Sequence, residues 1–237
     1  MLVEVKDVVK AFKKQQVLNH INLSIYEKEI FGLIGPSGSG KTTLIRLIMG
    51  AISADQGSVH VGGNQVPSLS ALDAIGYMPQ NDALYDDISG MDNLMFFGGM
   101  YHMSKKELRS KAEEVLKLVE LENDSTKKVL NYSGGMKKRL SLAVALLHSP
   151  KILILDEPTV GIDPILRKKI WEEFNHLKEQ GKTILVTTHV MDEATKCDRL
   201  GLLYNGVLID CDTVEELLAK TSNNTIEELF LSKGEEK

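Results

Sequence analysis

The stretch "IFGLIGPSGSGKTTLIRLIMG", residues 30–50, decides the fold. It opens with a short continuous apolar run, the pattern of a β-strand buried on both faces. Its last nine residues, "TTLIRLIMG", predict a helix that ends at Gly50. Between them, residues 35–42 match G-x-x-x-x-G-K-[ST] in the strand–loop–helix context that this phosphate-binding motif requires. The stretch therefore predicts an α/β protein with a nucleotide site at the end of a strand.

The residue types in this loop suit a polyphosphate. Glycines let backbone N–H groups converge on phosphate oxygens, and the N-terminus of the following helix adds positive potential. We expect Lys41 to reach the β- and γ-phosphates and the Thr42 hydroxyl to hold Mg²⁺. A plain glycine-rich turn would not require a Lys-Thr pair after a buried strand. The motif alone does not specify the class of NTPase.

Two acidic residues follow another predicted buried strand, "ILILDE". Asp156 and Glu157 thus lie at the carboxyl end of the strand, where ligand sites of α/β proteins form. We interpret Asp156 as a partner of Mg²⁺ and Glu157 as the group that polarises the attacking water. The alternative is two acids that merely cap a strand end. It does not explain why they accompany a complete phosphate loop.

Two further polar residues end predicted strands. His189 follows "LVTT", and we expect it to contact the γ-phosphate, although a lone histidine at a strand end is more often structural. Gln80 ends "IGYMPQ" at the start of a helical block. Without the other motifs, a surface glutamine at the start of a loop would be an equally good interpretation.

The hydrophobic pattern changes character twice along the chain. Strand patterns dominate residues 1–80, helical patterns follow one another over 81–148, and strands alternate with helices over 149–237. Within the helical part, a helix after Ser133 is predicted with one apolar face: Met136, Leu140, Ala143, Val144 and Leu147. We interpret 1–80 and 149–237 as an α/β core with a β subdomain, and 81–148 as an inserted all-α subdomain.

Composition limits the function. The 237 residues are 43% hydrophobic and 26% charged, which is ordinary for a globular protein. A net charge of −5 makes nucleic acid a poor partner, and the run at residues 137–139 (Lys-Lys-Arg) is interpreted as a solvated helix face. Cys197 and Cys211 lack metal-ligand spacing, so zinc is not expected. No apolar run approaches the ~20 residues that span a bilayer, so another polypeptide must supply any membrane span.

A second anion site is predicted in the helical part, at "NYSGGM", residues 131–136. Ser133 suits the N-cap of a helix, and Gly134 and Gly135 leave backbone N–H groups unobstructed at its positive end. A plain N-cap needs no paired glycines. Because one nucleotide has little use for two phosphate cradles, we expect a dimer in which each cradle meets the nucleotide of the other chain.

Together these motifs resemble the ATP-binding subunit of an ABC transporter over essentially the whole chain. The resemblance implies a P-loop ATPase core of α/β class, with a mixed sheet, an N-terminal antiparallel β subdomain and an inserted all-α subdomain. It implies catalytic roles for Lys41, Gln80, Glu157 and His189. It implies Mg²⁺ contacts from Thr42, Gln80 and Asp156. It implies ATP contacts from Phe12, Gly35, Pro36, Ser37, Gly38, Ser39, Gly40, Lys41, Thr42, Thr43, Ser133, Gly134, Gly135 and Asp163.

The signature at 132–136 departs from the usual Leu-Ser-Gly-Gly-Gln, because Tyr132 and Met136 replace its ends. The serine and both glycines remain, so ATP contact is expected to survive. The run "SGGMKKRLSLA" is similar to one branch of the family, which includes daunorubicin-type, sodium and lipid exporters. The resemblance therefore favours export over import.

The resemblance also implies partners: a second copy in an ATP-sandwich dimer, and a separate transmembrane permease that holds the chain on the cytoplasmic face of the membrane. About half of a Met/Phe-rich stretch is expected in the core, and the rest is a candidate groove for a permease helix: Leu94, Met95, Phe96, Phe97, Met100, Tyr101 and Met103. Two alternatives stay open, a soluble ABC ATPase outside transport and a regulatory module gated by ATP.

Overall fold

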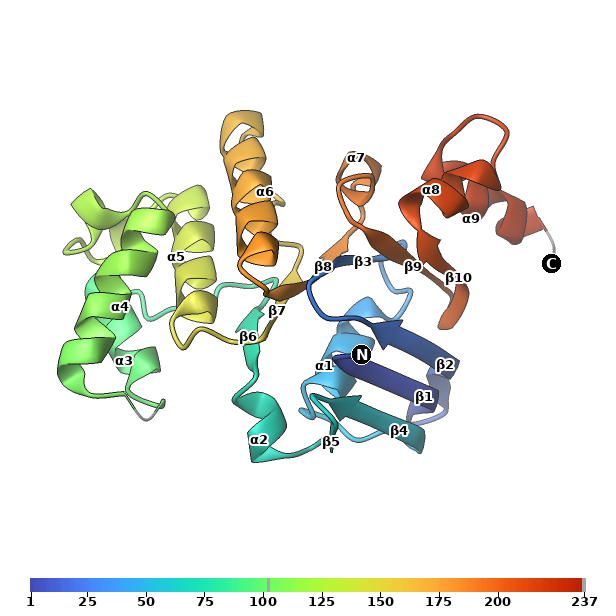
Figure 1. Ribbon diagram of the computed structural model, residues 1–237, viewed down its shortest axis with the longest axis horizontal. Coiled ribbons are helices and arrows are strands. Elements are labelled where there is room, and N and C mark those ends of the chain that lie inside the picture. The colour runs from blue at the N-terminus through green and yellow to red at the C-terminus, as the bar shows by residue number, and fades with distance from the viewer. Residues whose placement is uncertain (102, 236–237) are drawn as a thin grey trace.

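The computed structural model describes residues 1–101 and 103–235, which form two sheets with helices around them (Figure 1). Within these residues, one sheet has the strand order β10-β9-β3-β8-β7-β6 and the other has the order β2-β1-β4-β5. The strands of the first sheet span, in that order, Val207–Thr213, Arg199–Tyr204, Ile30–Ile34, Thr183–Thr188, Ile152–Asp156 and Ile75–Met78. The predicted α/β class, with a mixed sheet and a separate antiparallel sheet, is confirmed.

The middle of the larger sheet is parallel and buried on both faces. β8 pairs with β3 and β7, β9 pairs with β3, and β6 pairs with β7, all in parallel, whereas β10 is antiparallel at the edge. Every residue of β3, β7 and β8 is buried, and the apolar runs of β3 and β7 predict this for those two strands. Side chains of β3 alternate between two cores, since Phe31 and Leu33 belong to one and Ile30 and Ile34 to the other.

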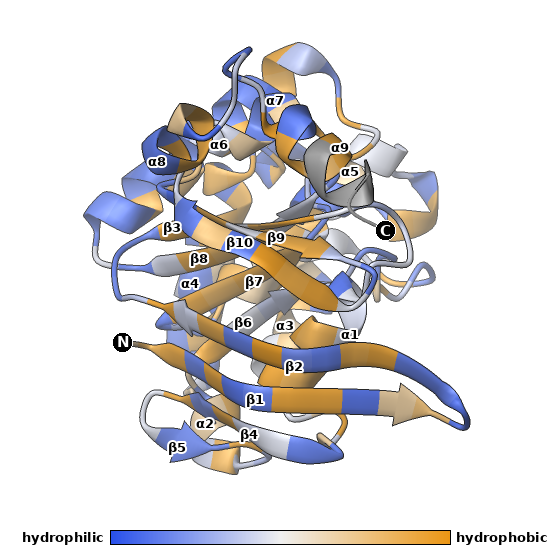
Figure 2. Ribbon diagram, turned by 90° about the vertical axis from the view of Figure 1, so that its right-hand side faces the viewer, coloured by the Kyte–Doolittle hydropathy of each residue, from blue (hydrophilic) through white to orange (hydrophobic). Residues whose placement is uncertain are grey.

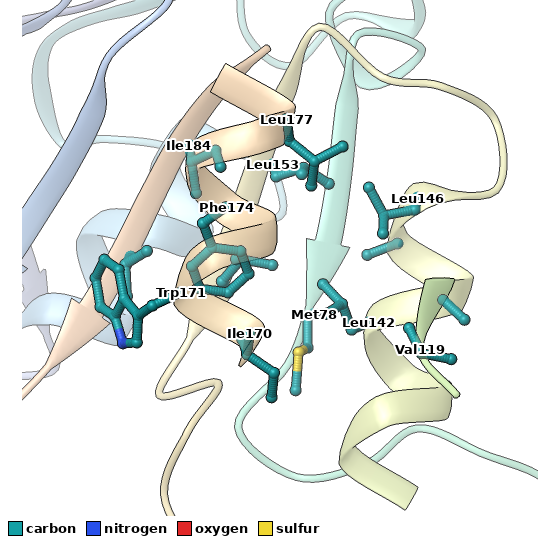
Figure 3. Close-up of a cluster of buried hydrophobic side chains, with 14 of the residues drawn as sticks. Met78, Val119, Leu142, Leu146, Leu153, Ile170, Trp171, Phe174, Leu177 and Ile184 are labelled. Atoms are coloured by element: carbon teal, nitrogen blue, oxygen red, sulfur yellow. The ribbon is translucent and has the colours of Figure 1, made fainter. Parts of the chain in front are cut away.

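Helix α6 (Pro164–Glu179) covers one face of this sheet. It buries Ile170, Trp171, Phe174 and Leu177, and these side chains meet apolar groups from β7, β8 and the helical block (Figure 3). Helix α1 (Lys41–Ile48) contributes its apolar side to the core on the other face. The phosphate loop therefore lies between β3 and α1, and both of these elements are packed into the core.

The antiparallel sheet packs against α1 and the larger sheet. Its strands are β1 (Val3–Phe12), β2 (Gln15–Ile25), β4 (Gln56–Val61) and β5 (Asn64–Gln65). Hydrophobic and hydrophilic residues alternate along β1 and β2 (Figure 2). The alternation of Val3 and Val5 with Glu4 and Lys6 predicts a half-buried strand, and this is confirmed, because Val3 and Val5 are buried while Lys6 is exposed. The register shifts after Val5, where Asp7 has a φ of 50°, and the strand then continues to its turn with β2.

The described part of the block between β6 and β7 contains helices joined by loops and no named strand (Figure 1). They are α3 (Gly90–Gly98), α4 (Lys105–Leu118), two short 3₁₀ turns (Glu122–Asp124 and Val129–Asn131) and α5 (Gly134–Leu146). The stretch "SKKE", Ser104 to Glu107, has the pattern of a capping box, and Ser104 caps α4 by accepting the N–H of Glu107. The prediction of a single apolar face for α5 is wrong. Leu142, Ala145 and Leu146 are buried as well, because α5 lies between β6 on one side and α3 and α4 on the other.

The chain ends in a hairpin and short helices. An Asn-Gly pair between two apolar runs predicts a hairpin with a type I′ turn. Asn205 and Gly206 confirm it, because they join β9 to β10 with φ angles of 47° and 76°. The remaining helices are α2 (Leu69–Leu72), α7 (Met191–Ala194), α8 (Val214–Ala219) and α9 (Ile226–Glu235). Over the described ranges, no helix has both the length and the apolar character that a membrane crossing requires.

We predict that Phe174→Ala lowers the free energy of unfolding by about 3–5 kcal/mol, because the ring is fully buried and its loss leaves a cavity. Phe174→Leu keeps most of the volume and should cost less than half as much. Chemical denaturation monitored by the single tryptophan, Trp171, measures both variants. Equal losses for the alanine and leucine variants would contradict the cavity argument.

Candidate active site

The loop between β3 and α1 has a backbone that requires glycine. Gly40 has a φ of 109°, a conformation that side chains disfavour. At Gly35, a Cβ atom would lie 2.1 Å from the carbonyl oxygen of Leu203 on the neighbouring strand. The hydroxyl of Ser39 is buried and has no hydrogen-bond partner among the described residues. The loop thus packs closely against β9, and the Ser39 hydroxyl inside it has no hydrogen bond to the described residues.

Lys41 is buried at the start of α1 although it carries an ammonium group. Its Nζ donates to the carbonyl oxygens of Gly35 (2.6 Å) and Pro36 (3.1 Å). Burial lowers the pKa of Lys41, and the carboxylates of Glu157 and Asp156 oppose that shift. A cavity of about 310 Å³ opens beside it, lined by Val17, Ser37, Gly38, Gly40, Lys41, Thr42, Thr43, Gln80 and Glu157.

Asp156, the last residue of β7, is buried and held by two hydroxyl groups. Thr187 Oγ1 donates to its Oδ1, and Thr42 Oγ1 lies 3.4 Å from its Oδ2. The structure therefore brings two of the three predicted Mg²⁺ contacts, Thr42 and Asp156, next to each other. Both offer oxygen atoms, the ligands that Mg²⁺ prefers.

Glu157 has its two carboxylate oxygens engaged by different strand ends. Gln80 Nε2 donates to Oε2 (2.8 Å), and His189 Nδ1 lies 3.1 Å from Oε1, a hydrogen bond that requires the proton on Nδ1. The backbone of Glu157 has a φ of 53°, a conformation that costs a non-glycine residue on the order of 1–3 kcal/mol. Its N–H donates to Thr187 Oγ1 (3.0 Å), so the surrounding bonds hold this backbone in place.

The second predicted cradle lies apart from this cavity. Ser133 caps α5 by accepting the N–H of Met136, as expected, and both Ser133 and Gly134 are exposed. A Cβ atom added at Gly134 would meet nothing within 4 Å, and at Gly135 only the Ser133 hydroxyl. No packing within the described chain therefore explains the two glycines. Their open faces are available to something outside the chain.

Phe12 and Asp163 are likewise not among the residues that line the cavity. Phe12 ends β1 with its ring 45% exposed and with Lys10 Nζ 5.5 Å from the ring centroid. Asp163 and Pro164 have the sequence pattern of an N-cap followed by proline at the first helical position. The structure confirms this helix start, because Asp163 caps α6 by accepting the N–H groups of Ile165 and Leu166.

Sequence reasoning missed several hydroxyl groups beneath the site. Thr187 bridges Asp156 and Glu157 by donating to the first and accepting from the second. Thr188 and Thr159 both donate to the buried carboxylate of Glu193, at 2.9 and 2.5 Å. Two adjacent threonines in a fully buried strand were the available signal, since buried hydroxyls need partners.

The interpretation of residues 137–139 as a solvated helix face is wrong. Lys137 Nζ pairs with Asp86 (2.6 Å), and Lys138 Nζ donates to the carbonyl oxygen of Gln80. Arg139 Nη1 donates to the carbonyl oxygens at the end of α4, those of residues 119 and 120. Each cation therefore connects α5 to another segment, which periodicity along a single helix does not reveal.

The Met/Phe-rich stretch divides between core and surface. Leu94 is buried and Met95 and Met103 pack against the core, while Phe96 and Met100 are 46% and 64% exposed. The other two members line a groove of about 480 Å³ beside the Gln80 segment. Its walls are Met49, Leu72, Asp73, Ile75, Tyr77, Pro79, Ala83, Leu84, Phe97, Tyr101, Ser141, Val144 and Ala145.

Comparison with known proteins places this geometry in a family. The model of the ABC transporter family matches residues 18–160, more than half of the chain. The linearmycin resistance ATP-binding protein LnrL of Bacillus subtilis is 38% identical over 98% of this chain and 75% of its own length. The Nod factor export ATP-binding protein I of Rhizobium meliloti is 42% identical over 86% of this chain and 62% of its own length.

A solved structure agrees over nearly the whole chain. It is a dimeric ATP-binding cassette in a post-hydrolysis state bound to ADP and Pi, which superimposes with a TM-score of 0.83 at 30% identity and covers 90% of this chain and 98% of its own. Sequence, fold and the strand-end cluster thus lead to one conclusion. The chain belongs to the ABC transporter family, as an ATP-binding and ATP-hydrolysing subunit of its exporter branch.

Proposed function

We propose that this ATPase powers export of a substrate through a separate membrane permease, with hydrolysis at Glu157. The observation that carries the proposal is the placement of the Glu157 carboxylate. It lines the Lys41 cavity while Gln80 and His189 each hold one of its oxygens. A fixed carboxylate beside a phosphate loop suits proton acceptance from an attacking water. The export direction is supported by the relatives named for export and drug resistance.

In this proposal Lys41 leaves its two carbonyl partners and neutralises phosphate charge in the cavity. Water attacks the γ-phosphorus, Glu157 takes its proton, the bond to the bridging oxygen breaks, and ADP and phosphate result. Thr42, Asp156 and Gln80 would hold Mg²⁺, which supplies charge neutralisation at the phosphate oxygens. The adjacent oxygen donors of Thr42 and Asp156 fit that ion.

We propose that a second copy completes each ATP site through Ser133, Gly134 and Gly135. The open faces of the two glycines support this assignment, because nothing within the described chain requires them. The dimeric relative bound to ADP and Pi supports it further. Residues 81–148 would then act as a unit that presents this cradle, and residues 1–80 with 149–237 would hold the nucleotide.

The permease is proposed to dock in the groove beside Gln80, on the cytoplasmic face of the membrane. The groove is largely apolar, and its walls come from both the core and the helical block. Pro79 and Ala83, which lie on either side of Gln80 in the sequence, form part of the groove wall. A partner helix seated there would therefore contact the segment that carries the Glu157 partner.

We predict that Glu157→Gln lowers ATP turnover by roughly 10²–10⁴-fold, because the amide cannot accept the proton. Nucleotide binding should persist, since Lys41 and its loop are unchanged. Phosphate release and equilibrium binding of a fluorescent ATP analogue measure the two effects. Glu172→Gln is the control, because Glu172 is exposed on α6. A Glu157→Gln chain that hydrolyses ATP within tenfold of wild type would rule out the assignment.

We also predict that Phe97→Glu prevents co-purification with the permease, which we expect the neighbouring open reading frame to encode. A charge placed in the apolar groove must be desolvated when a helix docks. Phe96→Glu is the matched control, because Phe96 is exposed and does not line the groove. Thermal melting checks that both variants fold. Retention of the permease by folded Phe97→Glu would place the docking surface elsewhere.

A further inference from the structure

Residues 80–86 lie between the end of β6 and helix α3, and two lysines of α5 contact them. Lys138 Nζ donates to the carbonyl oxygen of Gln80 and lies 3.8 Å from Asp82 Oδ1. Lys137 Nζ pairs with Asp86 Oδ1 at 2.6 Å. The segment is therefore fastened to α5 at both of its ends.

The Lys138 contact differs from an ordinary surface ion pair. The side chains of Lys138 and Asp82 are only 14% and 21% exposed. Asp82 Oδ1 is buried without a hydrogen-bond donor among the described residues, and burial raises the pKa of Asp82 while the Lys138 ammonium opposes that shift. The bond from Lys138 to the Gln80 carbonyl oxygen is charge-assisted, and such bonds are stronger than those between neutral groups.

Gln80 is held at both of its polar ends. Its side-chain amide donates to Glu157 Oε2, and its main-chain carbonyl accepts from Lys138. Lys138 is five residues after Ser133, on the same helix. A short path of bonds thus runs from Glu157 through Gln80 and Lys138 to the helix that presents the Ser133 cradle.

We propose that Lys138 is a positioning residue that couples the ATP site of one chain to the cradle the same chain offers to its partner. When the Gln80 side chain rearranges around nucleotide, the Lys138 bond keeps its main chain fixed to α5, so α5 moves with it. Without that bond, residues 80–86 would change conformation and α5 would stay in place. The proposal rests on the proposed function, which assigns Gln80 to the ATP site and Ser133 to the nucleotide of a second copy.

The test compares Lys138→Met, which keeps the stem and removes the charge, with Lys138→Arg, which restores a cationic donor. Lys169→Met is the control, because it makes the same change on another helix, where Lys169 forms an exposed pair with Glu120 at 2.8 Å. The first readout is hydrogen–deuterium exchange of the nucleotide-free full-length chain. We expect faster exchange over residues 80–86 in Lys138→Met alone. Unchanged exchange there would overturn the proposal.

The second readout is steady-state ATP hydrolysis. We expect Lys138→Met to lower kcat about tenfold while KM for ATP stays within about twofold, because the phosphate loop is untouched. Lys138→Arg should recover at least half of the wild-type kcat, and Lys169→Met should match wild type. A loss that arginine does not recover, or an equal loss in Lys169→Met, would indicate general destabilisation and would overturn the proposal.

The two proposals fail in different ways. A wild-type chain without ATPase activity, or an active Glu157→Gln chain, would sink the proposed function. If wild type and Glu157→Gln behave as expected but Lys138→Met has wild-type kcat and exchange, only the Lys138 proposal fails. The exchange measurement needs no nucleotide, so it remains decisive in either case.

Discussion

The parallel ladder of β3, β8 and β7 is the constraint on which the rest of the structure depends. Both faces of these strands are buried, so a polar side chain within them needs a partner at hand. Thr187 has such a partner in Asp156. The ionisable groups of the site lie instead at the carboxyl ends of the strands, which all point to the same edge of the sheet. The distance between Glu157 and His189 is thus a property of the sheet and only secondarily of the loops.

A second consequence of the ladder is the unusual backbone at Glu157. The chain leaves β7 in a left-handed conformation, which turns the carboxylate toward Gln80 and His189. Thr187 stabilises that turn through the N–H of Glu157. Thr187, on β8, therefore helps to set the backbone geometry of Glu157, which follows β7. The strained backbone of Glu157 is stabilised by its hydrogen bonds to residues at or near the ends of β6 and β8.

Sequence patterns predicted the parts of the fold in which one physical factor dominates. The buried strands, the Asp163–Pro164 helix start and the Asn205–Gly206 turn each follow from local chemistry. Local patterns failed for α5, because a helix between a strand and two other helices is buried on more than one side. They failed again at residues 137–139, where the partners are 19 to 58 positions away in sequence. The grouping of Lys41, Gln80 and Glu157 around one cavity was expected from strand ends, but the Thr187 bridge needed the register of β7 and β8.

The open faces of Gly134 and Gly135 mark a place where a substitution would leave folding intact and, in the proposed dimer, would impair activity. A side chain added at Gly134 would disturb no packing, so such a chain should fold, persist in the cell and escape quality control. In the proposed dimer, in which each ATP site takes residues from both copies, that chain would also pair with wild-type chains. Alleles at this position are therefore expected to be dominant over the wild-type allele, whereas alleles that damage the core around Phe174 are expected to be recessive.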